Sequence, residues 1–313
     1  MTCPPRILVL PPRLTASART LRATALRRGL RIVEATASAV PEGLGSPGWA
    51  GWPEGARWPE EPGQAGSPGG TRGTQDTRAA GSAESTRVAG STERTESTGC
   101  AGSDGHAVHL HAGPSFADVV APALGIALLE APADWLARLP RALTQRDIRA
   151  MTIGEAYRLR RPAFVKSPND KSIPALVYAD GSRLPGPDAV DPATVVLVSD
   201  VMTFAVEYRL HLLDGAVHAA GQYAEAGRLR LGPPDGDALA FGRDVLAAAG
   251  KTLPSAIVVD VGRDDEGRWA VIEANAAWAS GCYSADPDRA LETVLRAAGP
   301  ATALSSHDRA FVR

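Results

Sequence analysis

The stretch from Pro41 to Gly105 is the feature that most limits what this chain can fold into. It contains no Ile, Phe, Tyr or Met, and Gly, Ser, Thr, Glu, Arg and Pro dominate it. A segment of this composition buries too little apolar surface to offset the entropy of ordering its backbone. We therefore predict a disordered, low-complexity insertion here, with folded structure on both sides. Its aromatic residues either dock a partner or pack loosely within the insertion; they are Trp49, Trp52 and Trp58.

The composition of the whole chain is close to that of an ordinary globular protein. Hydrophobic residues make up 44% and charged residues 22% of the chain, and the formal net charge is −2. This charge gives no electrostatic reason to expect nucleic acid or a membrane as partner. The longest charge-free apolar run, Val119–Leu129, is about half a membrane span. Three scattered cysteines form neither a disulfide framework nor a zinc spacing, so we expect a cytoplasmic, reduced protein.

The first part of the chain has the hydrophobic pattern of an α/β domain. Arg6–Leu10, Thr15–Arg28 and Arg31–Val33 have the pattern of strand, helix and strand, which is typical of the start of a parallel sheet. We predict that this domain covers residues 1–142 and contains the insertion at 41–105. After the insertion it continues as strand, helix, strand and helix over Ala107–Leu110, Ser115–Leu124, Ile126–Leu129 and Ala133–Leu139.

Three histidines near position 110 could suggest a metal site. Strand alternation puts His109 and His111 on one face and His106 on the other, and no acidic or thiol partner lies nearby. We therefore interpret this cluster as the polar end of a strand.

The second part of the chain, residues 143–300, has the pattern of an α+β domain, followed by a tail over 301–313. The segment Arg146–Arg160 is amphipathic and predicts a helix that Pro162 ends. Further helices are predicted for Asp235–Ala249 and Asp288–Ala298. Strands are predicted for Ala163–Lys166, Ala175–Tyr178, Thr194–Ser199, Glu207–Leu213, Ala216–Tyr223, Ala256–Val261 and Trp269–Asn275.

Lysine is rare in this chain, where three lysines stand against thirty arginines and the first 165 residues contain none. Lys166 ends a predicted strand, and Lys171 lies in the loop that follows. Lysine is a compact point charge on a flexible stem, which suits a phosphate oxygen in a narrow site. The two could therefore hold a phosphate chain from two sides. Alternatively, Lys166 caps an apolar strand and Lys171 is a solvated loop charge.

A predicted hairpin near the C-terminus carries a group of acidic and amide residues. If its loop is 264–267, Asp260 faces Val271 directly. Glu273 then lies on the diagonal and Asn275 further along the same face, with neighbours roughly 5 to 8 Å apart. Such an oxygen-only donor set could share a divalent cation and favours Mg²⁺ or Mn²⁺ over zinc. A solvated hairpin face is the alternative, and a one-residue change of register would separate the acids.

Between these elements, a buried strand ends in a short segment and a new strand begins. The short segment could hold an adenine against its backbone. On the new strand, Glu207 and Arg209 lie two residues apart and therefore share one face. Glu207 and Arg209 either belong to the same site as the lysines and acids or form only a structural ion pair. The residues of the short segment are Ser199, Asp200, Val201 and Met202.

Taken in order, these motifs resemble the ATP-grasp superfamily, and most closely its clade that is named for one arginine and two lysines. The likeness rests on the two lysines, Glu207–Arg209, Asp260 and Glu273–Asn275, and it covers about Arg146–Ala298. It implies an α/β (α+β) fold in which a pre-ATP-grasp domain is followed by an ATP-grasp domain. Two β-containing subdomains of the latter would clasp ATP. The insertion departs from the family pattern.

The resemblance also implies which residues bind the nucleotide. Lys166 and Lys171 would contact the phosphates of ATP, and Glu207 would contact its ribose. The segment Ser199–Met202 would contact the adenine.

The remaining site residues would bind metal or act in catalysis. Asp260, Glu273 and Asn275 match the family's ligands for magnesium. Arg209 would face the γ-phosphate or an acyl phosphate, and Lys171 would assist it.

By this resemblance, the chain would be an ATP- and Mg²⁺-dependent ligase that joins a carboxylate to an amine or another nucleophile through an acyl phosphate. Its substrates would be small molecules or peptides. No Ser-His-Asp or Cys-His arrangement can be recognised in the sequence, so we do not expect a covalent enzyme nucleophile. The alternatives are a nucleotide-binding interaction module without turnover and a phosphotransferase. No motif specifies the substrates or the oligomeric state.

Overall fold

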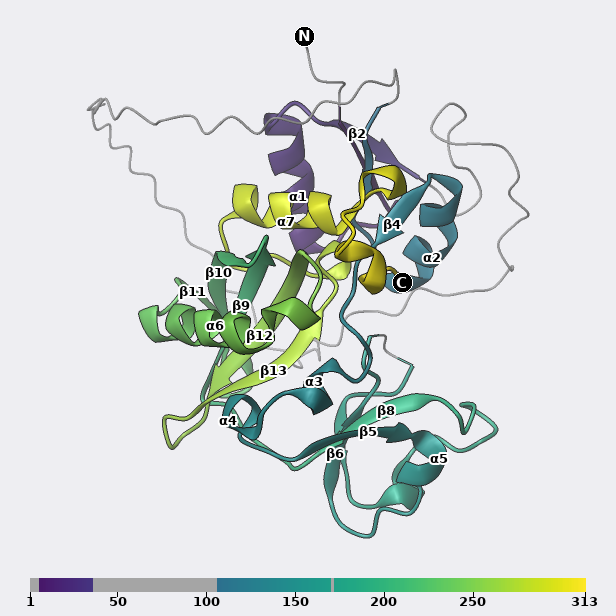
Figure 1. The fold of residues 1–313 in the computed structure, drawn as a ribbon, viewed down its shortest axis with the longest axis vertical. Coiled ribbons are helices and arrows are strands. Elements are labelled where there is room, and N and C mark those ends of the chain that lie inside the picture. Colours follow the sequence, from purple (N-terminus) through teal and green to yellow (C-terminus); the bar gives the residue numbers. More distant parts are fainter. Residues whose placement is uncertain (1–5, 36–105, 170–171) are drawn as a thin grey trace, which may run out of the picture. The chain divides into compact units, whose positions relative to one another are not determined.

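The computed structural model of the protein describes residues 6–35, 106–169 and 172–313 (Figure 1). Lys171 and the insertion predicted at 41–105 lie outside the described residues. The described strands form four sheets, with the orders β2-β1-β3, β14-β4, β5-β8-β6-β7 and β11-β10-β9-β12-β13. The α/β fold class predicted from the sequence is confirmed.

The N-terminal sheet is parallel, and β1 (Ile7–Leu10) lies between β2 (Arg31–Glu34) and β3 (Val108–Leu110). Helix α1 (Ala16–Arg27) connects β1 to β2. It begins at Thr15, whose side chain accepts a hydrogen bond from the N–H of Ala18 at 3.1 Å, which caps a free backbone donor. It is followed by Gly29 at φ +75°, a conformation that favours glycine. The strand–helix–strand opening is therefore confirmed.

The last residues of the chain return to this N-terminal region. Strand β14 (Ala298–Pro300) pairs antiparallel with β4 (Ile126–Leu128), next to α2 (Pro114–Ala123). The N–H of Arg313 donates to the carbonyl of Leu128 at 2.9 Å, and its guanidinium forms ion pairs with Asp118 and Glu130. Residues 301–313 are thus held against the N-terminal region by backbone and side-chain bonds.

The four-stranded sheet is antiparallel and consists of β5 (Ile148–Thr152), β6 (Ala163–Lys166), β7 (Leu176–Tyr178) and β8 (Val195–Ser199). The helix predicted over Arg146–Arg160 is wrong, because its first part is β5 and only α5 (Ile153–Ala156) is helical. All of β5 pairs with β8, and this long-range pairing outweighs the local helical spacing. A capping box between Thr152 and Glu155 starts α5.

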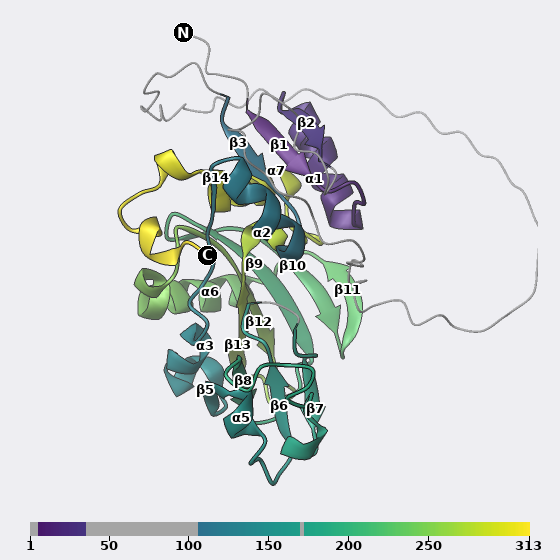
Figure 2. The same cartoon turned by 90° about the vertical axis from the view of Figure 1, so that its right-hand side faces the viewer.

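The five-stranded sheet is also antiparallel. Helix α6 (Gly236–Ala249) packs against it, and α7 (Pro287–Ala297) packs against α1 (Figures 1 and 2). Within the described residues, no helix is long and apolar enough to cross a membrane. The edge strand β11 had no counterpart among the predicted strands. The bounds are β9 (Val206–Leu213), β10 (Ala216–Glu225), β11 (Arg228–Gly232), β12 (Ala256–Arg263) and β13 (Trp269–Asn275).

Two apolar cores show how these sheets are joined. One core combines Ile7 and Leu110 of the N-terminal sheet with Val258 of β12 and with Trp278, which follows β13. The other core lies under the four-stranded sheet and consists of buried residues between Ile153 and Val198. The five-stranded sheet therefore shares a core with the N-terminal sheet, whereas most buried apolar residues of the four-stranded sheet form a separate core. Leu197 of β8 is an exception, because it packs in a further core with the five-stranded sheet.

Candidate active site

The hairpin of β12 and β13 brings the predicted acidic residues together. Asp260 lies directly opposite Glu273, not opposite Val271 as predicted from the sequence. The register differs for two reasons. The loop spans 264–268, because Arg263 pairs with Trp269, and a β-bulge leaves Ile272 without a partner.

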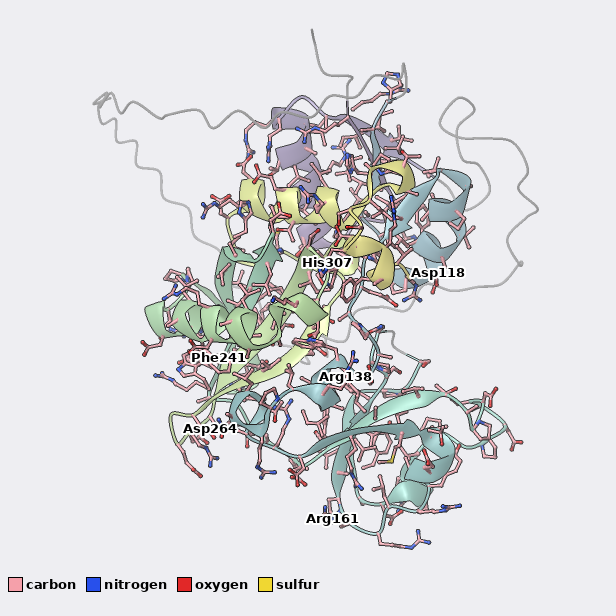
Figure 3. All side chains as sticks on the ribbon, viewed as in Figure 1. Asp118, Arg138, Arg161, Phe241, Asp264 and His307 are labelled. Carbon is pink, nitrogen blue, oxygen red and sulfur yellow. The ribbon has the colours of Figure 1, made fainter. Side chains whose placement is uncertain are left out.

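The longer loop is stabilised by Asp264, which lies at the turn between β12 and β13 (Figure 3). Its carboxylate accepts hydrogen bonds from the N–H groups of Glu266 and Arg268 at 3.0 and 2.8 Å. A carboxylate that binds its own loop in this way favours a turn, so it sets the length of the loop and hence the register.

A buried ion pair joins Asp260 to Arg209 on the neighbouring strand β9. The Nε and Nη2 atoms of Arg209 donate to the two carboxylate oxygens of Asp260 at 2.8 and 2.7 Å. The side chains are only 10% and 1% exposed. Burial lowers the pKa of Arg209, but Asp260 outweighs this effect and holds the pKa above its ordinary value. Burial also raises the pKa of Asp260, against the opposing effect of Arg209. Arg209 is therefore firmly held as a cation.

The side chain of Glu273 connects the five-stranded sheet to the four-stranded sheet. Lys166, the last residue of β6, donates to Glu273 on β13. The amide nitrogen of Asn275 donates to Glu273 at 2.8 Å and to Asp260 at 3.1 Å. Burial raises the pKa of Glu273, but Lys166 and Asn275 outweigh it and lower the pKa to about 2. Glu273 is consequently a carboxylate at any ordinary pH.

The donor chemistry of this cluster fits a magnesium ion. Asp260, Glu273 and Asn275 supply only oxygen ligands, which hard divalent cations prefer. The described residues include no group of three His, Cys, Asp or Glu that could hold a metal ion, so the amide of Asn275 would have to complete the set. Because Lys166 and Arg209 already bond to the two carboxylates, a bound cation would compete with them.

Glu207 shares the strand face of Arg209, as predicted, and accepts a hydrogen bond from the hydroxyl of Tyr223 at 2.5 Å. Burial raises the pKa of Glu207, the Tyr223 bond opposes this, and Asp260 and Glu273 add to the rise. The rings of Tyr223 and Tyr283 are stacked 5.2 Å apart. The guanidinium of Arg209 lies 5.6 and 4.8 Å from their centroids, which favours the cation.

The segment after β8 links the two larger sheets. The N–H of Asp200 donates to the carbonyl of Asp147 at 3.1 Å, and the hydroxyl of Ser199 donates to the carbonyl of Asp200 at 3.0 Å. Val201 is 53% exposed. A cavity of about 460 Å³ lies beside Ser199 and Asp200, within the size range of small-molecule sites. Lys166 and Glu273 line a separate, smaller cavity.

Arg146 is a residue of this site that the sequence reasoning missed. Its guanidinium donates to the carbonyls of Thr144, Val271 and Ile272 at 3.0, 2.9 and 3.2 Å, and so ties the start of β5 to β13. Burial lowers the pKa of Arg146 to about 10, and Glu273 opposes this effect. Nothing in the sequence distinguishes Arg146 from the other arginines, since its role depends on contacts with a distant strand.

Two buried histidines lie close to the Arg209 pair. His211 is two residues from Arg209 on the same strand face, and neither of its ring nitrogens has a hydrogen-bond partner among the described residues. The same is true of Nδ1 of His111, which follows β3. Burial lowers the pKa of His111 to about 4 and that of His211 to about 3, and Arg209 adds to the effect on His211. Both imidazoles are therefore neutral in the fold.

Gly221 makes room for the loop that contacts Arg209. It lies opposite Arg209 on β10, and a Cβ at this position would lie 2.3 Å from Oγ of Ser284 and 2.7 Å from the backbone nitrogen of Ala285. We expect Gly221→Ala to lower the free energy of unfolding by about 1–3 kcal/mol, measured by urea denaturation. Gly236→Ala, where a Cβ would meet no atom within 4 Å, is the control. Equal midpoints for the two variants would contradict this close packing.

Residues 143–293 match a family model of the ATP-grasp domain, the second family of the clade that is named for one arginine and two lysines. The chain contains an ATP-grasp domain of this clade. This ATP-grasp domain starts within α4 (Arg141–Thr144) and ends within α7, so it includes both larger sheets and the site between Lys166 and Asn275. The family resemblance noted in the sequence is thereby confirmed.

Several solved structures are similar to this ATP-grasp protein. D-cycloserine synthetase DcsG shares 13% identity over 92% of this chain and 98% of that chain, with a TM-score of 0.48. An ATP-grasp RimK domain protein from Sphaerobacter thermophilus shares 14% identity over 93% and 99%, with a TM-score of 0.44. An L-amino acid ligase from Bacillus licheniformis shares 16% identity over 46% of this chain and 38% of that chain, with a TM-score of 0.32. No curated protein matches the chain.

Proposed function

We propose that this ATP-grasp protein is an ATP-dependent ligase that joins a carboxylate to an amine or another nucleophile through an acyl phosphate. The observation that carries the proposal is the cluster in which Lys166 and Arg209 bond to two neighbouring carboxylates, Glu273 and Asp260. Two cations and two acids, held by strands of two different sheets, form a site suited to a polyphosphate and its metal ion.

The nucleotide would lie between the four-stranded and five-stranded sheets. Lys166 would exchange Glu273 for a phosphate oxygen, and Lys171 would approach the phosphates from the loop that follows β6. Ser199–Met202 would contact the adenine, and Glu207 would contact the ribose. Arg146 supports this arrangement, because it holds β5 against β13 at the end of the sheets where the adenine would bind.

Asp260, Glu273 and Asn275 would hold Mg²⁺ or Mn²⁺. When bound, such an ion polarises phosphate oxygens and neutralises the charge on them. Arg209 is kept cationic by Asp260 and by the faces of Tyr223 and Tyr283, so it would supply positive charge to the transferring phosphoryl group.

The proposed reaction has two steps. In the first, an oxygen of the substrate carboxylate attacks the γ-phosphorus, the bond from that phosphorus to its bridging oxygen breaks, and ADP leaves. In the second, the amine nitrogen attacks the carbonyl carbon of the acyl phosphate. The carbon–oxygen bond to the phosphate then breaks, inorganic phosphate leaves, and the proton of the amine passes to solvent. Arg209 and Lys171 neutralise charge in the first step.

Hydroxylamine trapping tests the proposal. The full-length protein is incubated with ATP, Mg²⁺, hydroxylamine and panels of amino acids or peptides as carboxylates. ADP together with a hydroxamate is the expected result, because hydroxylamine captures an acyl phosphate. A stable phosphorylated product without hydroxamate would indicate a phosphotransferase. Nucleotide binding without any ADP would indicate an interaction module, and either of these outcomes would overturn the ligase proposal.

The proposal also covers the setting of the reaction. We propose a cytoplasmic protein whose substrates are small-molecule or peptide carboxylates and amines. We place the boundary between the preceding α/β domain and the ATP-grasp domain at 142/143.

We expect Glu273→Gln to lower ATP turnover by at least about 100-fold, since it removes a carboxylate from the metal and phosphate site. The amide can still bond to Asn275, so circular dichroism should show an intact fold, while the urea midpoint should fall because Lys166 loses its carboxylate partner. ADP release is the measurement. Glu266→Gln is the control, because Glu266 lies in the same hairpin and its side chain is 71% exposed. Full ATP turnover by Glu273→Gln would contradict the assignment of Glu273 to the metal and phosphate site.

We expect Lys166→Ala to weaken ATP binding by about tenfold or more, because a charged contact to phosphate is lost. Calorimetric titration of ATP in the presence of Mg²⁺ measures this. Lys251→Ala is the control, since Lys251 is an exposed lysine in the turn after α6 and belongs to none of the strands that carry the candidate site. If both variants bind ATP with wild-type affinity, Lys166 only caps its strand.

A further inference from the structure

The outer strand of the five-stranded sheet, β11, is unusually open. Its residues Arg228–Leu231 are exposed, and Leu229 and Leu231 are 72% and 55% exposed. Among the described residues, β11 pairs only with β10, so its other edge carries unpaired backbone N–H and C=O groups. An open edge strand with exposed apolar side chains tends to pair with another chain. Such an edge is therefore either an aggregation risk or a binding site.

The two leucines of β11 lie on the same face of the sheet as the candidate active site. Ala224 pairs with Leu229 on one side and with Glu207 on the other, and residues directly opposite each other in an antiparallel sheet share a face. Leu231 shares the face of Leu229, because it lies two residues further along the strand. A chain that extended the sheet beside β11 would therefore present alternate side chains towards the site.

A continuous set of contacts leads from the end of β11 to Arg209. Gly232, the last residue of β11, accepts a hydrogen bond from the hydroxyl of Ser284 at 2.8 Å. The preceding residue, Tyr283, is 39% exposed, and its ring centroid lies 4.8 Å from the guanidinium of Arg209. Tyr283 also has φ +46°, a conformation that is uncommon for residues other than glycine and is found at functional sites. The open edge therefore ends beside the proposed site of carboxylate activation.

The charges of β11 argue against a second copy of this chain as its partner. In a symmetric antiparallel pair that sets Leu229 opposite Leu231, Arg230 lies opposite its own copy, and like charges directly opposite are destabilising. Arg228 and Arg230 instead favour an acidic strand. Arg230 forms one ion pair, with Glu225 at 2.6 Å, which leaves the edge with an excess of positive charge.

Among the described residues, the other edge strand with exposed large apolar side chains is β7, which lacks these features. Leu176 and Val177 are 55% and 52% exposed, but they are consecutive and therefore point to opposite faces. The strand has only three residues. It serves as a matched control for β11.

We propose that β11 is the docking edge for an extended, acidic peptide that is the substrate of this enzyme. The peptide adds as a further strand, its apolar side chains pack on Leu229 and Leu231, and a carboxylate next to the docked segment reaches Arg209. This mode of recognition combines main-chain hydrogen bonds with side-chain pockets on one face. The inference rests on the proposed ligase function, since it names the carboxylate substrate as a peptide.

Selection from a displayed library of short random peptides on the full-length protein tests this inference. We expect enrichment of sequences that alternate apolar and acidic residues. A synthetic peptide of the most enriched sequence should bind at least about tenfold more weakly to the Leu229→Lys, Leu231→Lys double variant. Arg228→Glu should also weaken it. The matched control, Leu176→Lys with Val177→Lys, should bind it within about twofold of wild type.

Three outcomes would overturn the inference. These are no enrichment, enrichment of peptides that the β11 variants still bind normally, and a dimer in sedimentation experiments that the β11 variants dissociate. ATP titration of every variant separates this test from that of the proposed function. A β11 variant that binds ATP normally but loses the peptide supports the docking edge alone. Normal ligase activity without enrichment of any peptide would contradict the docking role of β11 but would agree with the proposed ligase function.

Discussion

Arg209→Ala is expected to lower the free energy of unfolding by about 3–5 kcal/mol. The substitution leaves Asp260, whose side chain is 1% exposed, without its bidentate partner, and an uncompensated buried charge is strongly unfavourable. Urea denaturation followed by circular dichroism measures the change. Arg296→Ala is the matched control, because its ion pair with Asp214 has side chains 49% and 56% exposed and should contribute less than about 1 kcal/mol. Similar losses in both variants would contradict the buried character of the Arg209 pair.

A double variant separates stability from activity at the same pair. Arg209→Met combined with Asp260→Leu removes both charges and keeps the volume similar, and such replacements of buried ion pairs are often neutral or stabilising. We expect this variant to recover most of the stability lost in Arg209→Ala, with no ATP turnover. Recovered turnover would show that the pair has only a structural role.

The protein is expected to lose stability in mild acid because His111 and His211 are buried as neutral imidazoles. Their pKa values in the fold are about 4 and about 3, below the value of about 6.5 in an unfolded chain. Below pH about 6.5 the unfolded chain binds protons that the folded protein does not, so the free energy of unfolding falls as the pH falls. At pH 5 each histidine accounts for a loss of about 2 kcal/mol relative to neutral pH. Above pH about 6.5 the full stability is present.

Urea denaturation at neutral pH and at pH 5 measures this loss. Glu273 does not contribute in this range, because its pKa is lowered to about 2 and the difference from the unfolded chain appears only near and below the ordinary value for Glu. His211→Leu removes one of the two groups and should reduce the difference between the two pH values by about 2 kcal/mol. Equal stability at the two pH values in the wild type would show that the imidazoles are accessible to protons.

The parts of the fold that the sequence predicts best are those with a strong local signal. The bounds predicted for Ala163–Lys166 and Trp269–Asn275 are those of β6 and β13, because polar or turn-forming residues delimit each apolar run. The helix predicted for Arg146–Arg160 was wrong. The apolar spacing of this segment suits a helix, but the conformation of its first part depends on pairing with β8. Long-range pairing of this kind leaves no local trace in the sequence.

The candidate site shows the same difference between features that local sequence patterns predict and features that depend on long-range contacts. Residue type and strand alternation were sufficient to bring Asp260, Glu273 and Asn275 together, although the predicted register was wrong. The β-bulge and the longer loop each add a residue, and neither follows from the pattern of apolar residues. Arg146 could not be found, because its importance comes from the carbonyl groups of a strand far away in the sequence. The role of Lys171 stays a prediction, since it lies outside the described residues.

The core shared by the N-terminal sheet and β12 means that the family module and the folding unit do not coincide. Ala256 and Val258 of β12, together with Trp278, are buried against strands that lie outside residues 143–293. Helix α7 likewise depends on α1 for the burial of its apolar side chains. A fragment cut at the borders of the ATP-grasp domain would expose these surfaces and should aggregate instead of folding. The four-stranded sheet differs, because most of its buried apolar residues form a separate core, so we expect it to open locally before the rest of the described fold.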